Sequence, residues 1–326
     1  MKSTAVGPSN IAFVKYWGRK DEVLRLPANA NISFCLDGLT TTTTVEFSDI
    51  YPEDDVTIDY EKNEKDTAKI SKHLNRVRKL AGISQKAKVV TINNFPSGTG
   101  LSSSASGFAA LTIAAVAAAN LKLSEKDLSI LARQGSGSAC RSIPDGFVEW
   151  CDADTSEESY AYSLFPPEHW NLIDIVAVVS TEKKRVSTSE GQKLAQTSPF
   201  FIERSKHIDA KNELAKQLLK EKKFHELGAL MEKEALEMHA IMITSTPPLL
   251  YWTQGSLKIM KLVQQWREEE HIPVYFTVNT GQDIHLICEE PTKNIVLEKL
   301  KGVEEVRKTL VSRPGKGAHL IEDHLF

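Results

Sequence analysis

Serine and glycine residues gather in one short segment of the 326-residue sequence, FPSGTGLSSS at 95–104. Glycines let a backbone approach a ligand closely, and serine hydroxyls together with the free N–H groups at a helix start attract anions. The candidate phosphate ligands are Thr99, Ser102, Ser103 and Ser104. The segment lacks the GxxxxGK[ST] pattern of a Walker A loop. An ordinary serine-rich helix start is the alternative interpretation.

A second loop of small residues, GSGSACRS at 135–142, contains an arginine, Arg141. Serine and backbone donors beside a guanidinium suit a carboxylate or a phosphate, because the planar fork of arginine makes two parallel hydrogen bonds. By itself the loop is equally well explained as a turn between helices with a surface arginine. Two such loops in one chain favour a shared pocket for an anionic ligand.

Lys15 directly follows an apolar run, IAFV, where a lysine is unfavourable unless it is paired or functional. Tyr16 and Trp17 offer aromatic surface close to the cations Arg19 and Lys20. For Arg19 and Lys20 a solvated strand end is the alternative. For Lys15 we expect a functional role.

Local patterns indicate the elements that position these residues. A strand over 87–93 leads into the first serine loop and a helix over 105–120 follows it. The apolar segment 172–180 is typical of a strand buried on both faces, and 199–239 is helical. Further strands are predicted over 40–47, 56–60, 147–151, 274–278 and 284–288. The class is therefore α+β, with a break near Glu182.

Composition excludes several classes of protein. Lys and Arg total 40 against 43 Asp and Glu, so no general basic surface points to nucleic acid. No CxxC pair occurs among the four cysteines, so we expect buried free thiols at Cys35, Cys140, Cys151 and Cys288. Neither a signal-peptide pattern nor about 20 consecutive apolar residues occurs, and we expect a cytoplasmic protein outside membranes.

Three segments together resemble one enzyme family: PSNIAFVKYWGRKDEVLRLP, NNFPSGTGLSSSASGFAAL and ARQGSGSACRSIPDGFVEW. They are similar to the mevalonate-pathway decarboxylases of the GHMP kinase superfamily, and the similarity continues in order over nearly the whole chain. The ending, PVYFTVNTG followed by GKGAHLIEDHLF, more closely resembles the mevalonate 5-phosphate decarboxylases (phosphomevalonate decarboxylases). Diphosphomevalonate decarboxylases usually have FDAGPN at that strand end.

The resemblance implies a fold and a reaction. The fold is the two-domain GHMP kinase fold, with a ribosomal-protein-S5-like ATP-binding domain over 1–181 and a ferredoxin-like domain over 182–326. The reaction is ATP- and Mg2+-dependent decarboxylation of (R)-mevalonate 5-phosphate to isopentenyl phosphate, through phosphorylation of the 3-hydroxyl. The alternatives are a diphosphomevalonate decarboxylase that forms isopentenyl diphosphate, a kinase that stops at the 3-phosphate, and a nucleotide-binding protein without turnover. A homodimer without nucleic-acid or membrane partners is also implied.

The same resemblance assigns roles to residues. ATP would be bound by Ser97, Gly98, Thr99, Gly100, Leu101, Ser102, Ser103 and Ser104, with Mg2+ at Ser103 and Ser104. The catalytic residues would be Lys15, Ser138, Arg141 and Asn279. Arg141 would hold the substrate carboxylate, and Lys15 would lie beside the carboxylate and the 3-hydroxyl. The substrate would also contact Asn10, Tyr16, Lys20, Ser136, Ser187 and Thr188.

Asn279 departs from the family pattern. The family has an aspartate two residues before the glycine of this segment, proposed to orient or deprotonate the 3-hydroxyl, and this chain reads VNTG. Asparagine has the shape of aspartate but cannot accept the proton or carry a negative charge. Either an engineered Asp-to-Asn change gives an inactive variant, which the otherwise intact motifs favour, or the enzyme works without this base. Asp283 is a candidate substitute, with a structural turn residue as its alternative.

Overall fold

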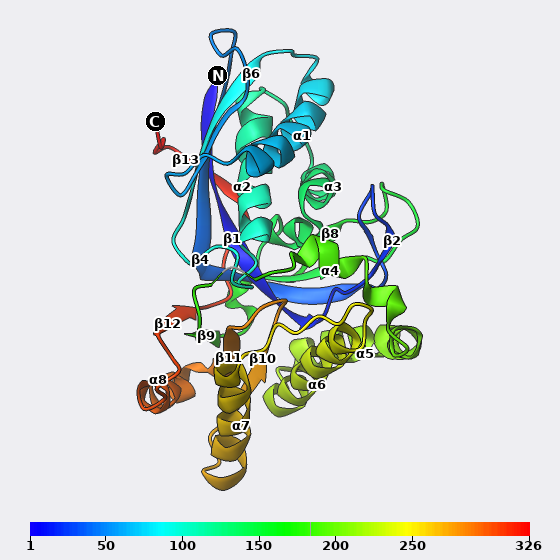
Figure 1. The fold of residues 1–326 in the computed structure, drawn as a ribbon, viewed down its shortest axis with the longest axis vertical. Helices are drawn as coiled ribbons and strands as arrows, with labels where there is room; N and C mark the ends of the chain where they lie inside the picture. The colour runs from blue at the N-terminus through cyan, green and yellow to red at the C-terminus, as the bar shows by residue number, and fades with distance from the viewer. Residues whose placement is uncertain (183) are drawn as a thin grey trace.

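Two β-sheets organise the chain in this computed structural model, which describes residues 1–182 and 184–326 (Figure 1). The first sheet has seven strands, in the order β13-β1-β4-β6-β5, with β7 paired to β4 and β8 paired to β7. Its strands are β1 (Lys2–Val14), β4 (Asn31–Ser48), β5 (Asp55–Ile58), β6 (Lys86–Asn93), β7 (Phe147–Trp150), β8 (Ala161–Phe165) and β13 (His319–Ile321). A small separate hairpin consists of β2 (Arg19–Asp21) and β3 (Leu26–Pro27).

Strand β4 is longer than the predicted strand over 40–47. Its threonine-rich second half pairs with β6, and its first half, from Asn31 to Phe34, pairs with β7. Strand β1 was not predicted, because Gly7 and Pro8 interrupt its pattern. Gly7 is required there by packing, since a Cβ would lie 2.4 Å from the backbone oxygen of Ser106 on the helix above it.

Three helices lie on one face of this sheet: α1 (Glu64–Ala81), α2 (Ser103–Ala118) and α3 (Glu125–Gly135) (Figure 1). Helix α2 packs on β1 and β4, and its alanines are buried on most sides because small side chains allow a close approach to the sheet. The second loop of small residues forms a short 3-10 helix, η1 (Gly137–Ser142), between α3 and β7. Both serine loops therefore lie at ends of elements packed on β1.

The second sheet has four antiparallel strands in the order β10-β11-β9-β12. These are β9 (Leu172–Val178), β10 (Val274–Thr277), β11 (Ile284–Glu289) and β12 (Lys308–Ser312). The accompanying helices are α4 (Thr188–Gln192), α5 (Phe201–Glu221), α6 (Phe224–Ile243), α7 (Gln254–Glu269) and α8 (Lys293–Lys301). The helical pattern predicted over 199–239 is thus two helices, which separate where Lys222 adopts a left-handed conformation with φ 54°. The short 3-10 helices are η2 (Pro167–His169), η3 (Ala195–Thr197) and η4 (Glu290–Thr292).

Strand β9 is buried on both faces, as predicted. Ile173, Ile175 and Ala177 pack toward α7 and α8, whereas Val176 and Val178 join a core that also contains residues of β1 and β4. This shared core connects the two halves of the chain. Strand β9 lies before the predicted domain boundary at 181/182 but belongs to the second sheet. The position of the boundary between the two domains stays a prediction.

The expectation of buried free thiols is confirmed for three of the four cysteines and was wrong about the burial of Cys151. All four cysteines are free thiols, and Cys35, Cys140 and Cys288 are buried, whereas Cys151 is partly exposed. Among the described residues, no helix is long and apolar enough to cross a membrane. The α+β class and the two-part architecture also agree with the prediction.

Candidate active site

The first serine loop approaches the second half of the chain through glycine contacts. Gly98 and Gly100 have φ angles of 78° and 118°, which glycine adopts without strain. A Cβ on Gly100 would lie 2.5 Å from the Cα of Gly281, in the turn after β10. The loop and this turn therefore touch backbone to backbone, and neither position has room for a side chain.

The N-terminus of α2 is suited to an anion. Ser102 precedes the helix in a left-handed conformation and its side chain caps no backbone N–H group. The first turn contains no acidic residue, and the dipole of this 16-residue helix adds positive potential there. Among the described residues, the buried hydroxyl of Thr99 makes no close hydrogen bond and interacts only weakly with the Asp283 carboxyl. These features fit the phosphates of a nucleotide.

A magnesium ion would depend on the nucleotide itself. The described residues contain no group of three His, Cys, Asp or Glu side chains that could hold a metal. Mg2+ commonly keeps several waters and binds substrate phosphates together with few protein oxygens. The hydroxyls of Ser103 and Ser104 suit that arrangement. Ser103 Oγ accepts a hydrogen bond from the Gly98 N–H at 3.4 Å, and Ser104 Oγ accepts one from Ser136 Oγ at 3.2 Å.

Arg141, on η1, is buried, and some of the N–H groups of its guanidinium already donate hydrogen bonds to other side chains. Its Nε donates to Ser33 Oγ at 3.0 Å, its Nη2 donates to Asn10 Oδ1 at 3.0 Å, and its Nη1 donates to Asn31 Oδ1. These bonds use three of the five N–H groups of arginine and leave one on each terminal nitrogen. Two such donors match the two oxygens of a carboxylate. Burial lowers the pKa of Arg141, but arginine keeps its charge.

Asn10 connects Arg141 to the second serine loop. Besides accepting from Arg141, its Nδ2 donates to the Ser142 hydroxyl at 2.8 Å and to the Ser138 carbonyl at 3.2 Å. Close by, a Cβ on Gly137 would lie 2.8 Å from the hydroxyl of Tyr16, so glycine is needed for the approach. Strand β1 and η1 are thereby joined at the level of the predicted substrate carboxylate site.

Lys15, immediately after β1, is fully buried without a carboxylate partner among the described residues. The Nζ hydrogen bond found there is to Asn279 Oδ1, at 3.4 Å. Burial lowers the pKa of Lys15 from 10.5 to about 7, Glu234 opposes this, and Arg141 adds to it. The pKa of Lys15 is therefore well below that of an exposed lysine, because its ammonium is buried.

A buried ion pair holds the backbone of Lys15. Glu234 Oε2 accepts from the Lys15 N–H at 3.1 Å and from Arg204 Nη2 at 2.8 Å, and the same Arg204 nitrogen donates to the Lys15 carbonyl at 2.8 Å. Burial opposes ionisation of Glu234, but Arg204 and Lys211 together hold the pKa of its carboxyl below its ordinary value. Helices α5 and α6 thus position Lys15 through charged side chains that contact its main chain.

Asn279 bridges Lys15 and the first serine loop. Its Nδ2 donates to Ser102 Oγ at 3.1 Å, and its carbonyl accepts from His239 Nε2 at 2.9 Å. Burial lowers the pKa of His239 to about 3, so this histidine is neutral and orients the Asn279 backbone.

Asp283, the candidate substitute for the missing aspartate, has a structural contact. Its Oδ1 accepts a hydrogen bond from the Val179 N–H at 3.0 Å, and burial raises the pKa of its carboxyl.

Hydrogen bonds connect these parts into one cluster at the junction of the two halves. Lys15, Asn279 and Ser102 form one chain of contacts, while Ser104 and Ser136 join the two serine loops. The bonds of Asn10 extend the cluster to Arg141 and Ser138. The two loops, the lysine and the arginine thus gather, as expected from the sequence, although the role of each residue stays a prediction.

Other predicted site residues contact different groups. Tyr16 accepts from Arg19 Nε at 2.8 Å, and Lys20 pairs with Asp152 at 2.7 Å and with Asp154 at 3.0 Å. Arg19 is buried, so the solvated-strand-end interpretation was wrong for it but agrees with the exposed Lys20.

The remaining predicted ligands have mainly structural contacts. Ser187 caps helix α4 in a reciprocal arrangement with Glu190, and the Leu101 carbonyl accepts from Ser9 Oγ at 2.7 Å. Thr188 shares a hydrogen bond of 2.6 Å with Thr280, beside the Asn279 turn. Ser97 is partly buried, and its side chain has no hydrogen-bond partner among residues 1–182 and 184–326.

Sequence reasoning missed Lys184. Its Nζ donates to the Thr280 carbonyl at 2.7 Å and to Thr188 Oγ1 at 2.7 Å, and its backbone N–H donates to the Gly98 carbonyl at 3.3 Å. Burial lowers its pKa to about 8. The basic run KKR was the available signal, but only the fold places one of its members between the serine loop and the turn. Glu234 and Arg204 had no local signal.

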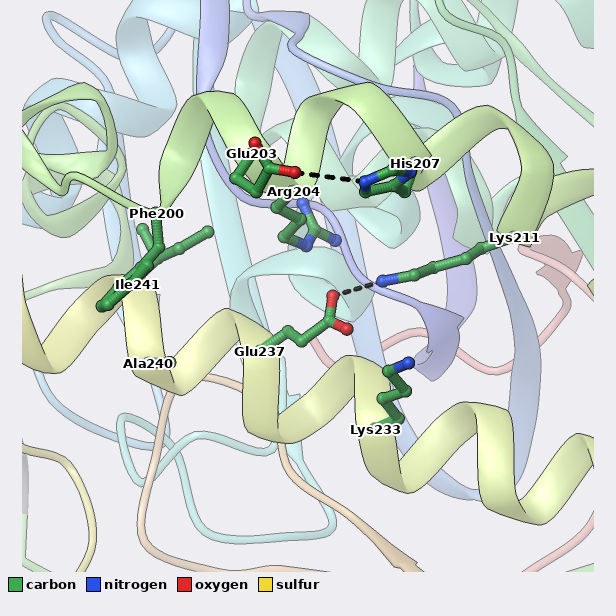
Figure 2. A pocket seen from close by; sticks show the side chains of 9 residues that line it. All are labelled: Phe200, Glu203, Arg204, His207, Lys211, Lys233, Glu237, Ala240 and Ile241. Carbon is green, nitrogen blue, oxygen red and sulfur yellow. Dashed lines mark hydrogen bonds and ion pairs between the residues drawn. The ribbon is translucent and has the colours of Figure 1, made fainter.

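A cavity of about 330 Å3 lies between α5 and α6, away from the serine loops (Figure 2). Figure 2 shows a hydrogen bond between Glu203 and His207 along α5, and the ion pair between Lys211 on α5 and Glu237 on α6 across the cavity. Arg204 lines the same cavity and reaches past it to the Lys15 backbone. The cavity is thus adjacent to the support of the site but does not contain the cluster.

Comparisons with known proteins agree over nearly the whole chain. Residues 7–161 match the diphosphomevalonate decarboxylase-like N-terminal domain, and residues 174–318 match the mevalonate 5-diphosphate decarboxylase C-terminal domain. The diphosphomevalonate decarboxylase of Candida albicans is 34% identical over 316 residues, which cover 91% of this chain and 87% of that protein. The human diphosphomevalonate decarboxylase is 34% identical over 300 residues, 85% of this chain and 74% of that protein.

Solved structures give the same result. The mevalonate diphosphate decarboxylase of Staphylococcus aureus is 38% identical with a TM-score of 0.92, covering 98% of both chains. A structure described as MDDEF in complex with MVAPP, AMPPCP and magnesium is 36% identical with a TM-score of 0.92, covering 99% of both chains. The two-domain architecture is therefore that of the GHMP-kinase-like decarboxylases. With both halves matched in order, the chain belongs to the diphosphomevalonate decarboxylase family.

Proposed function

We propose that this protein is an ATP-dependent decarboxylase that converts mevalonate 5-diphosphate to isopentenyl diphosphate, with ADP, phosphate and CO2 as the other products. The observation that carries the proposal is the hydrogen-bonded cluster of Lys15, Asn279, both serine loops and Arg141. It places anion donors for a nucleotide next to cations suited to a carboxylate. A kinase that stops at the 3-phosphate has no need for the second feature.

The chemistry explains why both features are needed. A tertiary 3-hydroxyl is a poor leaving group and phosphate is a good one, so transfer of the γ-phosphoryl group of ATP to this hydroxyl makes C3 electron-poor. Loss of phosphate and of CO2 then gives the alkene. The leaving charge is stabilised by nearby donors, and Mg2+, when bound, neutralises phosphate charge during transfer.

Residues of this chain would divide these tasks. The free N–H groups of α2, together with Ser102, Ser103 and Ser104, would bind ATP phosphates and help to hold Mg2+. The two remaining donors of Arg141 would orient the substrate carboxylate, with Ser136 and Ser138 close to the transferred phosphoryl group. The relative that carries AMPPCP and magnesium supports this choice of nucleotide and ion.

The number of phosphates on the substrate separates the two decarboxylase readings. The sequence ending favoured mevalonate 5-phosphate, but the relatives named above are diphosphomevalonate decarboxylases, and they give the monophosphate no support. They also do not support the interpretation of Asn279 as an inactivating change. The homodimer and the cytoplasmic location stay predictions.

The proposal is tested by measuring CO2 and ADP with each of three substrates: mevalonate, its 5-phosphate and its 5-diphosphate. We expect both products in equal amounts, with the largest kcat/KM for the 5-diphosphate. A larger kcat/KM for the 5-phosphate would reverse the substrate assignment. ADP without CO2 would indicate a 3-kinase, and nucleotide binding without either product would contradict an enzymatic function.

A further inference from the structure

Lys15 carries a buried amine whose protein environment supplies no counter-ion. In the described part of the chain its side chain has no carboxylate within ion-pair distance, and Asn279 offers only a neutral carbonyl oxygen at 3.4 Å. An uncompensated buried ammonium is strongly unfavourable. A lysine in this position either loses its proton or keeps it only when an anion from outside the protein binds beside it.

The acidic groups that face Lys15 are already in use. Glu234, on α6, binds the Lys15 backbone N–H together with Arg204 and Lys211. Asp174, on β9, accepts from His285 Nδ1 at 2.7 Å. Both raise the pKa of Lys15, but neither forms an ion pair with its Nζ.

The cationic and neutral groups around Lys15 do not help it to hold a proton. Arg141 on η1 and Arg204 on α5 are cations that lower its pKa. His239 on α6 is neutral, because burial lowers its pKa to about 3. Burial and the two arginines outweigh the two carboxylates, neither of which forms an ion pair with Nζ, and the pKa of Lys15 is thereby lowered to about 7.

We propose that the carboxylate of the substrate is the counter-ion that Asn279 does not provide, so that Lys15 takes up a proton from solvent when the substrate binds. The ligand named here rests on the proposed function. Asn279 thereby makes substrate binding depend on the carboxylate, since an aspartate at this position would neutralise Lys15 in the empty site. The remaining N–H groups of Arg141 hold the same carboxylate from another side.

This coupling has a definite pH dependence. If the bound complex keeps Lys15 protonated to pH 9, binding takes up about half a proton at pH 7 and about 0.9 at pH 8, given a pKa of about 7 in the free protein. The Kd for the substrate then rises about fivefold from pH 7 to 8 and about ninefold from pH 8 to 9. The affinity for the substrate decreases as the pH rises, because the proton that Lys15 takes up becomes less available from the solvent.

Isothermal titration calorimetry without ATP measures the uptake directly, from the binding enthalpy of mevalonate 5-diphosphate in buffers of different ionisation enthalpy. Isopentenyl diphosphate is the matched ligand, since it has the diphosphate but no carboxylate, and we expect no uptake at Lys15 for it. Lys15→Met should abolish the uptake and Asn279→Asp should strongly reduce it. Asn279→Ser, which adds no charge, should retain it.

An NMR titration of 13C-labelled lysine in the free protein, with Lys15→Met to assign the signal, gives a readout without ligand. We expect the Lys15 signal to titrate near pH 7. Equal proton uptake for the two ligands, unchanged uptake in Asn279→Asp, or a Lys15 signal that stays protonated at pH 9 would overturn the inference. Failure of mevalonate 5-diphosphate to bind at pH 6, where Lys15 is charged, would instead contradict the proposed function.

Discussion

Replacing Lys15 with methionine should stabilise the protein, most strongly at low pH. Methionine has a similar length and no charge, so it removes the ammonium from a fully buried position. The pKa of Lys15 is lowered from 10.5 to about 7, a difference of about 3.5. Protonation of Lys15 therefore costs free energy in the folded state, and the substitution with methionine removes this cost.

The magnitude follows from the difference in pKa. One unit corresponds to 1.36 kcal/mol, so the buried ammonium destabilises the folded state by about 5 kcal/mol below pH 7. Because the folded pKa is the lower one, this destabilisation is complete below it and declines as the pH rises toward 10.5. At pH 9 about 2 kcal/mol remains. Loss of the Asn279 hydrogen bond subtracts about 1 kcal/mol at any pH.

Urea denaturation of the wild type and of Lys15→Met at pH 6 and at pH 9 measures this difference. We expect the advantage of the variant in unfolding free energy to be about 3 kcal/mol larger at pH 6 than at pH 9. The comparison between pH values cancels packing changes caused by methionine. An advantage that does not change with pH, or that grows toward pH 9, would refute the reasoning that Lys15 is an uncompensated cation.

Three further substitutions test the support of the site. Glu234→Gln leaves Arg204 buried without its carboxylate and should lower the unfolding free energy by about 3–5 kcal/mol, measured by urea denaturation at pH 7. Because the pKa of Glu234 is lowered in the folded protein, this loss should shrink as the pH falls below 4.5. A loss that is equal at all pH values would contradict this expectation. Gly281→Ala places a Cβ 2.2 Å from the Thr99 carbonyl oxygen and should therefore raise the KM for ATP at least tenfold, which corresponds to about 1.4 kcal/mol. Circular dichroism should show that the variant keeps its fold. An unchanged KM would show that the contact between the loop and the turn is not needed for ATP binding. If the reaction uses a general base, Asn279→Asp should raise kcat about a hundredfold or more and leave the KM for ATP nearly unchanged, as measured by ADP release. Equal turnover in both forms would show that the enzyme works without that base.

Local sequence predicted most elements that carry the site. The strand over 87–93, the helix after the first serine loop and the strands on either side of Thr280-Gly281-Gln282 all occur close to their predicted positions. Their signals are local: β-branched runs, alanine-rich helix formers and glycine turns. Strand β1 was not predicted because Gly7 and Pro8 interrupt its pattern, and the need for glycine at position 7 is explained only by contact with α2.

The sequence alone determined which types of residue occur in the site. These are the two serine loops, the guanidinium of Arg141, Lys15 after an apolar run, and the neutral Asn279. Tertiary structure decided their partners. Lys15 and Asn279 lie 264 positions apart, and the Glu234–Arg204 pair that holds the Lys15 backbone comes from two later helices. Burial and charge pairing arise from contacts across the whole chain, so the lowered pKa of Lys15 and the roles of Glu234 and Lys184 depend on the folded arrangement and on no local pattern.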